Sequence, residues 1–126
     1  MNNLLGIDYG ERYVGLAIKK DNTPIPYAHK VIDIKENNLI KEIVNIVTDE
    51  NITTIVIGYP IGLMNNKSRM SDLVDKFIDK TLTKYIDLPI VKIDERLTSK
   101  ILNKDSSKRN DDLSAVKLLE TYSQNA

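Results

Sequence analysis

Two nearly continuous apolar runs near the N-terminus constrain the fold of this chain more than any other feature. The runs are "NLLGIDY" (3–9) and "YVGLAIK" (13–19), and a short turn, "GER" (10–12), joins them. Runs of this kind are typical of buried strands, so we expect a β-hairpin inside a sheet. Asp8 interrupts the first run at its end, where a carboxylate is costly unless it is hydrogen-bonded or lies beside a cation. It could start the turn by accepting backbone hydrogen bonds, or it could serve a site.

The rest of the chain alternates between strand and helix patterns. The pattern predicts further strands at "YAHKVIDI" (27–34), "ITTIVIG" (52–58) and "PIVKID" (89–94). One helix follows a cap at Asn37 or Asn38, and another begins near Ser68 to Met70. The apolar faces expected for these two helices are Leu39, Ile40, Ile43, Val44 and Val47, and Met70, Leu73, Val74, Phe77, Ile78, Leu82 and Tyr85.

Three further segments complete the pattern. We expect a short helix at "RLTSKIL" (96–102), a polar loop at "NKDSSKRN" (103–110), and a last helix from Asp111 or Asp112 to about Tyr122. The order is then βββαβαβα, which favours an α/β fold with a five-stranded mixed sheet, its second strand antiparallel and helices on both faces. This is the element order of ribonuclease H-like folds, and 126 residues suit one such domain, 1–126.

Composition excludes several classes of protein. There is no cysteine, so disulfides and thiolate metal sites are absent, and no apolar run is long enough for a membrane helix. No signal peptide is visible, so we expect a cytoplasmic protein that does not contact membranes. Net charge is zero, and positive charge is only local: Lys67 and Arg69 flank Ser68, and Lys100, Lys104, Lys108 and Arg109 lie close together in sequence. Such clusters can be solvated surface or phosphate contacts.

Acidic residues fall where the strands and the last helix would meet. Asp8 ends the first strand, Asp94 and Glu95 end the fifth, and Asp111 and Asp112 begin the last helix. Ligands of open α/β sheets bind beyond the carboxyl ends of the parallel strands. Carboxylates gathered there would repel one another without a cation, and oxygen ligands select Mg²⁺ or Mn²⁺. Each acid also has an ordinary explanation as a turn or cap residue, and periodicity places Asp111 and Asp112 symmetrically about the apolar face of their helix.

Four motifs resemble one family over nearly the whole chain. They are "GIDYGERYVGLAI" (6–18), "VIGYPIG" (56–62), "VKIDERLTS" (91–99) and "DDLSAVKLLETY" (111–122). In this order and spacing they are similar to the YqgF family, ribonuclease H-fold proteins related to Holliday-junction resolvases and described as nucleases in the maturation of precursor 16S ribosomal RNA. The chain departs from the family in the loop within "GYPIGLMNNKSRM" (58–70) and in having Ser114 where the family has alanine.

The resemblance implies the site residues. The family's acidic positions fall on Asp8, Glu95 and Asp111, which would be catalytic and would hold Mg²⁺ or Mn²⁺. Gly10 would allow a close backbone approach to the site. Residues that could contact nucleic acid, either from matching motif positions or from the positive segments, are Arg12, Lys67, Arg69, Arg96, Thr98, Lys108 and Arg109.

We therefore expect a metal-dependent nuclease, a hydrolase acting on phosphodiester bonds, in 5′-end maturation of precursor 16S rRNA. The alternative substrate is the Holliday junction, cleaved in DNA recombination or repair. The alternative class of protein is a non-catalytic nucleic-acid-binding module. The motif around Asp8 also occurs in the phosphate loop of actin-like ATPases, which need a second domain that 126 residues cannot supply. The expected partner is structured RNA or branched DNA, bound by a monomer or a weak homodimer.

Overall fold

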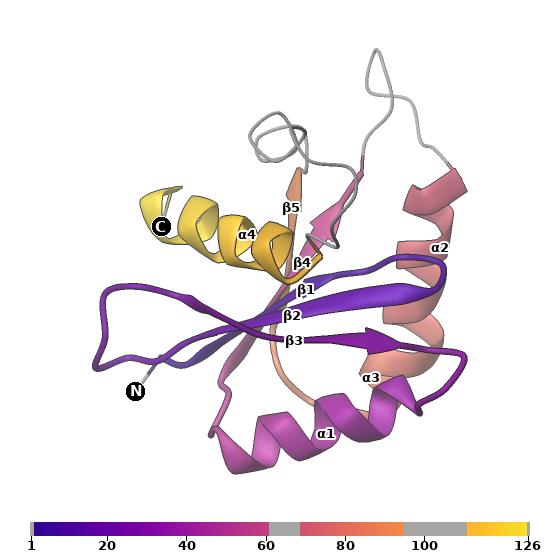
Figure 1. Cartoon of the computed structure of the whole chain (residues 1–126), viewed down its shortest axis with the longest axis horizontal. Coiled ribbons are helices and arrows are strands. Elements are labelled where there is room, and N and C mark those ends of the chain that lie inside the picture. The colour runs from indigo at the N-terminus through magenta and orange to yellow at the C-terminus, as the bar shows by residue number, and fades with distance from the viewer. Residues whose placement is uncertain (1, 61–68, 95–110, 126) are drawn as a thin grey trace.

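A five-stranded sheet with helices on both faces forms the structure (Figure 1). The computed structural model describes residues 2–60, 69–94 and 111–125, without the side chains of 111–112 and 124–125. The sheet order is β3-β2-β1-β4-β5. The elements are β1 (Leu4–Asp8), β2 (Tyr13–Lys19), β3 (Tyr27–Asp33), α1 (Leu39–Asp49), β4 (Thr54–Tyr59), α2 (Arg69–Phe77), η2 (Ile78–Leu82), α3 (Thr83–Tyr85), β5 (Ile90–Asp94) and α4 (Asp111–Asn125).

Strand directions confirm the predicted mixed sheet. β1 and β2 form the antiparallel hairpin, with Asp8 opposite Gly15, and β3 pairs antiparallel with β2. β1 pairs parallel with β4, and β4 pairs parallel with β5, so that Tyr59 lies opposite Asp94. The carboxyl ends of β1, β4 and β5 therefore meet at one edge of the sheet. β1, the strand that ends in Asp8, is the central strand.

Alternation along the strands produces two cores. Leu5 and Ile7 of β1 pack into a cluster with α1 and α2, whereas Leu4 packs into a second cluster with α4. Of the described helices, α4 lies on one face of the sheet, and α1 and α2 lie on the other (Figure 1). The last helix is confirmed, and its fully buried residues are Ala115, Leu118 and Leu119. No helix in the described ranges combines the length and the apolar character needed to span a bilayer.

Local signals in the sequence explain the start of α1 and the turn between β1 and β2. Asn38 is the N-cap of α1, where its side chain accepts a hydrogen bond from the Lys41 backbone N–H. Gly10 is needed because a Cβ there would lie 2.5 Å from the Tyr13 carbonyl oxygen. The backbone that comes close to Gly10 in the described structure is therefore that of Tyr13, at the end of the same turn. The short helix expected at 96–102 and the loop at 103–110 lie outside the described residues.

The prediction of a buried Tyr85 at the end of the second helix is wrong. The helix is interrupted by a π-turn, η2, in which the Thr83 backbone N–H bonds to the Ile78 carbonyl. A π-turn adds one residue to a turn and so rotates everything after it relative to the α-helical pattern. Leu82, which was expected on the apolar face, is buried, whereas Tyr85 is 58% exposed.

Candidate active site

Asp8 lies on the face of the sheet that α4 covers. Leu5 and Ile7 point into the cluster formed with α1 and α2, so their neighbours Leu4, Gly6 and Asp8 point the other way. Asp8 is half-buried at the carboxyl end of the central strand. The carboxylate is thus held on a rigid element beside a helix, a placement that a simple turn residue does not require.

Helix α4 approaches β1 very closely at Gly6. A Cβ at position 6 would lie 2.8 Å from Leu119 Cγ and 2.9 Å from the Ala115 carbonyl oxygen, so only glycine allows this contact. Asp111, the first residue of α4, precedes Ala115 by about one turn, or roughly 6 Å along the helix axis. Ala115 is fully buried at this contact.

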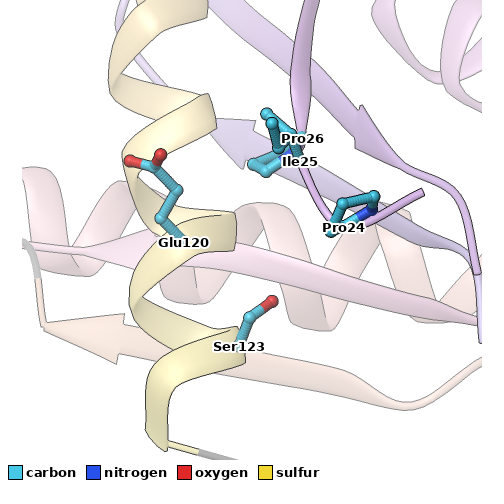
Figure 2. Close-up of a pocket in the computed structure, with 5 residues that line it drawn as sticks. All are labelled: Pro24, Ile25, Pro26, Glu120 and Ser123. Carbon is cyan, nitrogen blue, oxygen red and sulfur yellow. The ribbon is translucent and has the colours of Figure 1, made fainter.

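The direction of α4 brings its first turn to the Asp8 end of the sheet. The C-terminal half of the helix contacts the β2–β3 loop at the opposite end, where Glu120 and Ser123 face Pro24, Ile25 and Pro26 across a pocket of about 200 Å³ (Figure 2). Figure 1 shows the helix running from the middle of the sheet toward that loop. The backbone at the start of α4 therefore lies on the Asp8 side.

Asp94 lies on the opposite face from Asp8. In β5, Ile93 packs into the α4 cluster, while Lys92 contacts Asp75 of α2. Because side chains alternate, Asp94 shares the α2 face with Lys92. Asp94, the first of the two adjacent acids at the end of this strand, is therefore not on the same face of the sheet as Asp8. Glu95 itself lies outside the described residues.

Arg12 lies at the same edge, in the turn that follows β1. Its Nε and Nη2 donate hydrogen bonds to the carboxylate of Asp33, at 3.3 and 3.1 Å to Oδ2. These hydrogen bonds raise the pKa of the Arg12 guanidinium and hold the pKa of the Asp33 carboxyl below its usual range. The guanidinium carbon also lies 5.2 Å from the centre of the Tyr13 ring. Arg12 is thereby oriented by the end of β3, a partnership that the sequence did not indicate.

Arg69 is the other predicted phosphate contact that the structure describes. It begins α2, and its Nη2 lies 2.7 Å from Oε2 of Glu11 in the β1–β2 turn. The side chain is nevertheless 78% exposed. Tyr9 stacks on Phe77 with ring centres 4.5 Å apart, a second link between the end of β1 and α2. Burial raises the pKa of the Tyr9 hydroxyl.

The remaining predicted site residues are not tested by the structure. The side chain of Asp111 is not described, and Glu95, Lys67, Arg96, Thr98, Lys108 and Arg109 lie outside the described residues. Among the side chains that are described, no three acidic or histidine residues form a group that could hold a metal. The described part of the predicted constellation is therefore Asp8, Arg12, Arg69 and the backbone of Asp111.

Sequence reasoning missed two features of this region. Gly6 is the contact point for α4, and a glycine inside an apolar strand is the signal that a backbone comes close to it. A second group, Tyr59, Asp75 and Lys92, links the ends of β4 and β5 to α2. No spacing rule joins these three residues, because they come from three different elements.

Known proteins resemble this chain in sequence and in fold. A family model described as "RuvX: Holliday junction resolvase" matches residues 2–125. A Karelsulcia muelleri protein named "Putative pre-16S rRNA nuclease" is 38% identical over 103 residues, which are 82% of this chain and 73% of that protein. A protein of the same name from Natranaerobius thermophilus is 30% identical over 132 residues, 94% of this chain and 92% of its own.

The fold has a solved counterpart. The structure titled "T. thermophilus RuvC in complex with Holliday junction substrate" aligns with 100% of this chain and 97% of its own, with a TM-score of 0.54 and 14% identity. This similarity confirms the ribonuclease H-like fold expected from the element order. The sequence matches establish the family as well as the fold, because the family model and the relatives match nearly the whole chain. The chain belongs to the RuvX family, the family also known as YqgF.

Proposed function

We propose that this protein is a metal-dependent nuclease that hydrolyses phosphodiester bonds in the precursor of 16S ribosomal RNA. The observation that carries the proposal is the placement of Asp8 on the α4 face, at the end of the sheet where α4 begins. The proposed substrate is taken from the names of two relatives, which are 38% and 30% identical to this chain over the aligned residues. Hydrolysis by a bound ion needs no nucleophilic side chain, which agrees with a site built from carboxylates.

Asp8, Glu95 and Asp111 would hold the ion, and their donors fit Mg²⁺ or Mn²⁺. All three offer carboxylate oxygens, the ligands that hard divalent cations prefer, and the single histidine of the chain is exposed in β3. When bound, such an ion lowers the pKa of the attacking water and stabilises the negative charge on the departing 3′ oxygen. Asp8 contributes a ligand whose backbone is paired with Gly15 of β2 and directly follows Ile7, which is paired with Ile57 of β4.

The burial of α4 favours Asp111 over Asp112. The fully buried residues of the helix are Ala115, Leu118 and Leu119. At about 100° per residue, position 111 falls about 35° from the centre of that buried face and position 112 about 65°. The symmetric placement expected from the sequence depended on counting Val116 and Tyr122, which are only partly buried, as equal members of the face.

Alternation in β5 favours Glu95 over Asp94. Asp94 shares a face with Lys92 and α2, away from Asp8. We therefore propose Glu95, the acid that the family motif matches, as the ligand from this segment. Arg12 and Arg69 are charged groups at the same edge that could receive substrate phosphates, each already beside a carboxylate that the phosphate would replace.

The test is cleavage with two substrates and two variants. A precursor 16S rRNA fragment and a four-way DNA junction are incubated with the protein and either Mn²⁺ or a chelator. We expect Mn²⁺-dependent cleavage of the RNA, lost in Asp8→Asn and retained in Asp49→Asn, whose carboxylate is exposed at the end of α1. Cleavage of the junction alone would instead identify a resolvase. Binding without cleavage, unchanged in Asp8→Asn, would identify a non-catalytic module.

A further inference from the structure

Three side chains meet on the face of the sheet opposite α4 and join three elements. The Tyr59 hydroxyl of β4 donates a hydrogen bond to Oδ2 of Asp75 in α2 at 2.9 Å. The Lys92 ammonium of β5 donates to Oδ1 of the same carboxylate at 2.8 Å. Lys92 Nζ also lies 4.6 Å from the centre of the Tyr59 ring. Asp75 thus uses both oxygens to connect two neighbouring strands to one helix, an arrangement we call the Asp75 bridge.

The Asp75 bridge is placed at the carboxyl ends of β4 and β5. Tyr59 is the last residue of β4 and lies opposite Asp94, the last residue of β5, while Lys92 precedes Asp94 by two positions on the same face. In the described structure β5 is an edge strand of five residues, paired with β4 alone. Edge strands open locally at a lower free energy than central ones, so contacts from a helix matter more there.

Exposure indicates that the Asp75 bridge acts locally. The side chain of Asp75 is 22% exposed and that of Lys92 is 47% exposed. Ion pairs with this much solvent access contribute little to overall stability. They can still restrict the backbone to which they are attached, because both partners are anchored in regular structure. Here the restricted backbone is the end of β5, the residue before Glu95.

We propose that Asp75 is a positioning residue of the nuclease site. By holding Tyr59 and Lys92 together it fixes the carboxyl end of β5 against β4, up to the residue that precedes Glu95 in the sequence. This inference rests on the proposed function, since it assumes that Glu95 binds the ion. Asp75 itself lies on the face opposite Asp8 and acts only through the strand.

The test compares Asp75→Asn with a matched control in two measurements. Glu42→Gln removes the Lys30–Glu42 ion pair, which has a similar distance of 3.0 Å but joins β3 to α1. Hydrogen exchange of the 90–94 segment is measured without metal, and Mn²⁺ affinity is measured by calorimetry. Asp75→Asn should speed exchange in that segment by about fivefold or more. It should weaken Mn²⁺ binding on the order of tenfold, as loss of groups behind metal ligands does. Glu42→Gln should change neither.

Each outcome decides a separate claim. Exchange in 90–94 that is no faster in Asp75→Asn than in Glu42→Gln would overturn the positioning role. Faster exchange with unchanged Mn²⁺ affinity would overturn the link to the site. Failure of the wild type to bind Mn²⁺ would refute the proposed function, and the exchange result would still show whether Asp75 holds β5. If Asp75→Asn does not fold, Lys92→Met breaks the bridge on the β5 side and is judged by the same two measurements.

Discussion

Gly6→Ala tests the close contact between α4 and β1. The added Cβ would lie 2.8 Å from Leu119 Cγ and 2.9 Å from the Ala115 carbonyl oxygen. Ordinary van der Waals contact begins at 3.4 Å, so the helix must move by about 0.5 Å, since a rotamer change of Leu119 cannot move the backbone oxygen. Overpacking costs about 1–3 kcal/mol, and alanine recovers about 0.5–1 kcal/mol over glycine in a strand. From the middle of these two ranges, the net loss of unfolding free energy should be about 1 kcal/mol, measured by urea denaturation.

A double-mutant cycle with Leu119→Ala locates the origin of that loss. Leu119→Ala alone should cost about 2–5 kcal/mol because it leaves a cavity under α4. In the double variant the new methyl at position 6 occupies part of this space, so the combined loss should be smaller than the sum by about 0.5 kcal/mol or more. Additive losses, or a Gly6→Ala protein as stable as the wild type, would refute the reasoning.

The same variant separates stability from the site. Because Asp111 begins the helix one turn before Ala115, moving α4 also moves the proposed metal ligand. Gly6→Ala should therefore weaken Mn²⁺ binding, whereas Ile43→Val should not, although it costs a comparable 0.5–1.5 kcal/mol or so. Ile43 is fully buried in α1 on the other side of the sheet. Equal Mn²⁺ affinity in the two variants would contradict the role of α4.

Three further predictions follow from the same geometry. Mn²⁺ should raise the melting temperature of the wild type in a concentration-dependent way, because a protein that binds the ion is stabilised by it. The melting temperature of Asp8→Asn should not change, and an equal rise in both proteins would exclude Asp8 as a ligand. Asp111→Asn should lower the cleavage rate by a factor of order 10² with little change in stability. Asp112→Asn should cost at most about 1 kcal/mol in unfolding free energy and keep most of the cleavage activity. Loss of cleavage in Asp112→Asn but not in Asp111→Asn would favour Asp112 as the ligand. Arg12 lowers the folded-state pKa of Asp33, so the stabilisation it brings is complete above the unfolded-state pKa, near 3.9, and is lost as the pH falls through the lower folded value. Asp33→Asn should therefore be less stable than wild type in urea at pH 7 and equally stable in strong acid, and a difference independent of pH would contradict this cause.

Much of the fold could be predicted because local signals and long-range packing agree in this chain. The apolar hairpin, the Asn38 cap and the face of α4 each come from patterns within a few residues of sequence. The second helix failed at Tyr85 because a π-turn changes the period, and nothing in the composition of η2 marks where the extra residue enters. Periodicity describes a regular helix and cannot predict an irregular one.

The candidate site was predictable in a different way. The sequence pattern placed Asp8 at the end of a strand. Only the packing of the neighbouring residues, which shows which of them belong to each core cluster, places Asp8 on the α4 face and Asp94 on the opposite face. The partner of Arg12 is 21 positions away, in a strand whose register with β2 includes a shift. Such pairings depend on strand register across the sheet, which no short motif encodes.

The contact between Gly6 and Ala115 has a consequence for how the protein is made. It joins β1 to α4 across about 110 residues, so of the described helices the one that packs on this face of the sheet is synthesised last. Domains fold as units while chains emerge from the ribosome, and contacts so distant in sequence form late. A chain without α4 would therefore lack the helix that packs against Leu4, Ala17 and Val56. The proposed site, which needs both Asp8 and Asp111, would therefore assemble only when α4 packs on this face of the sheet.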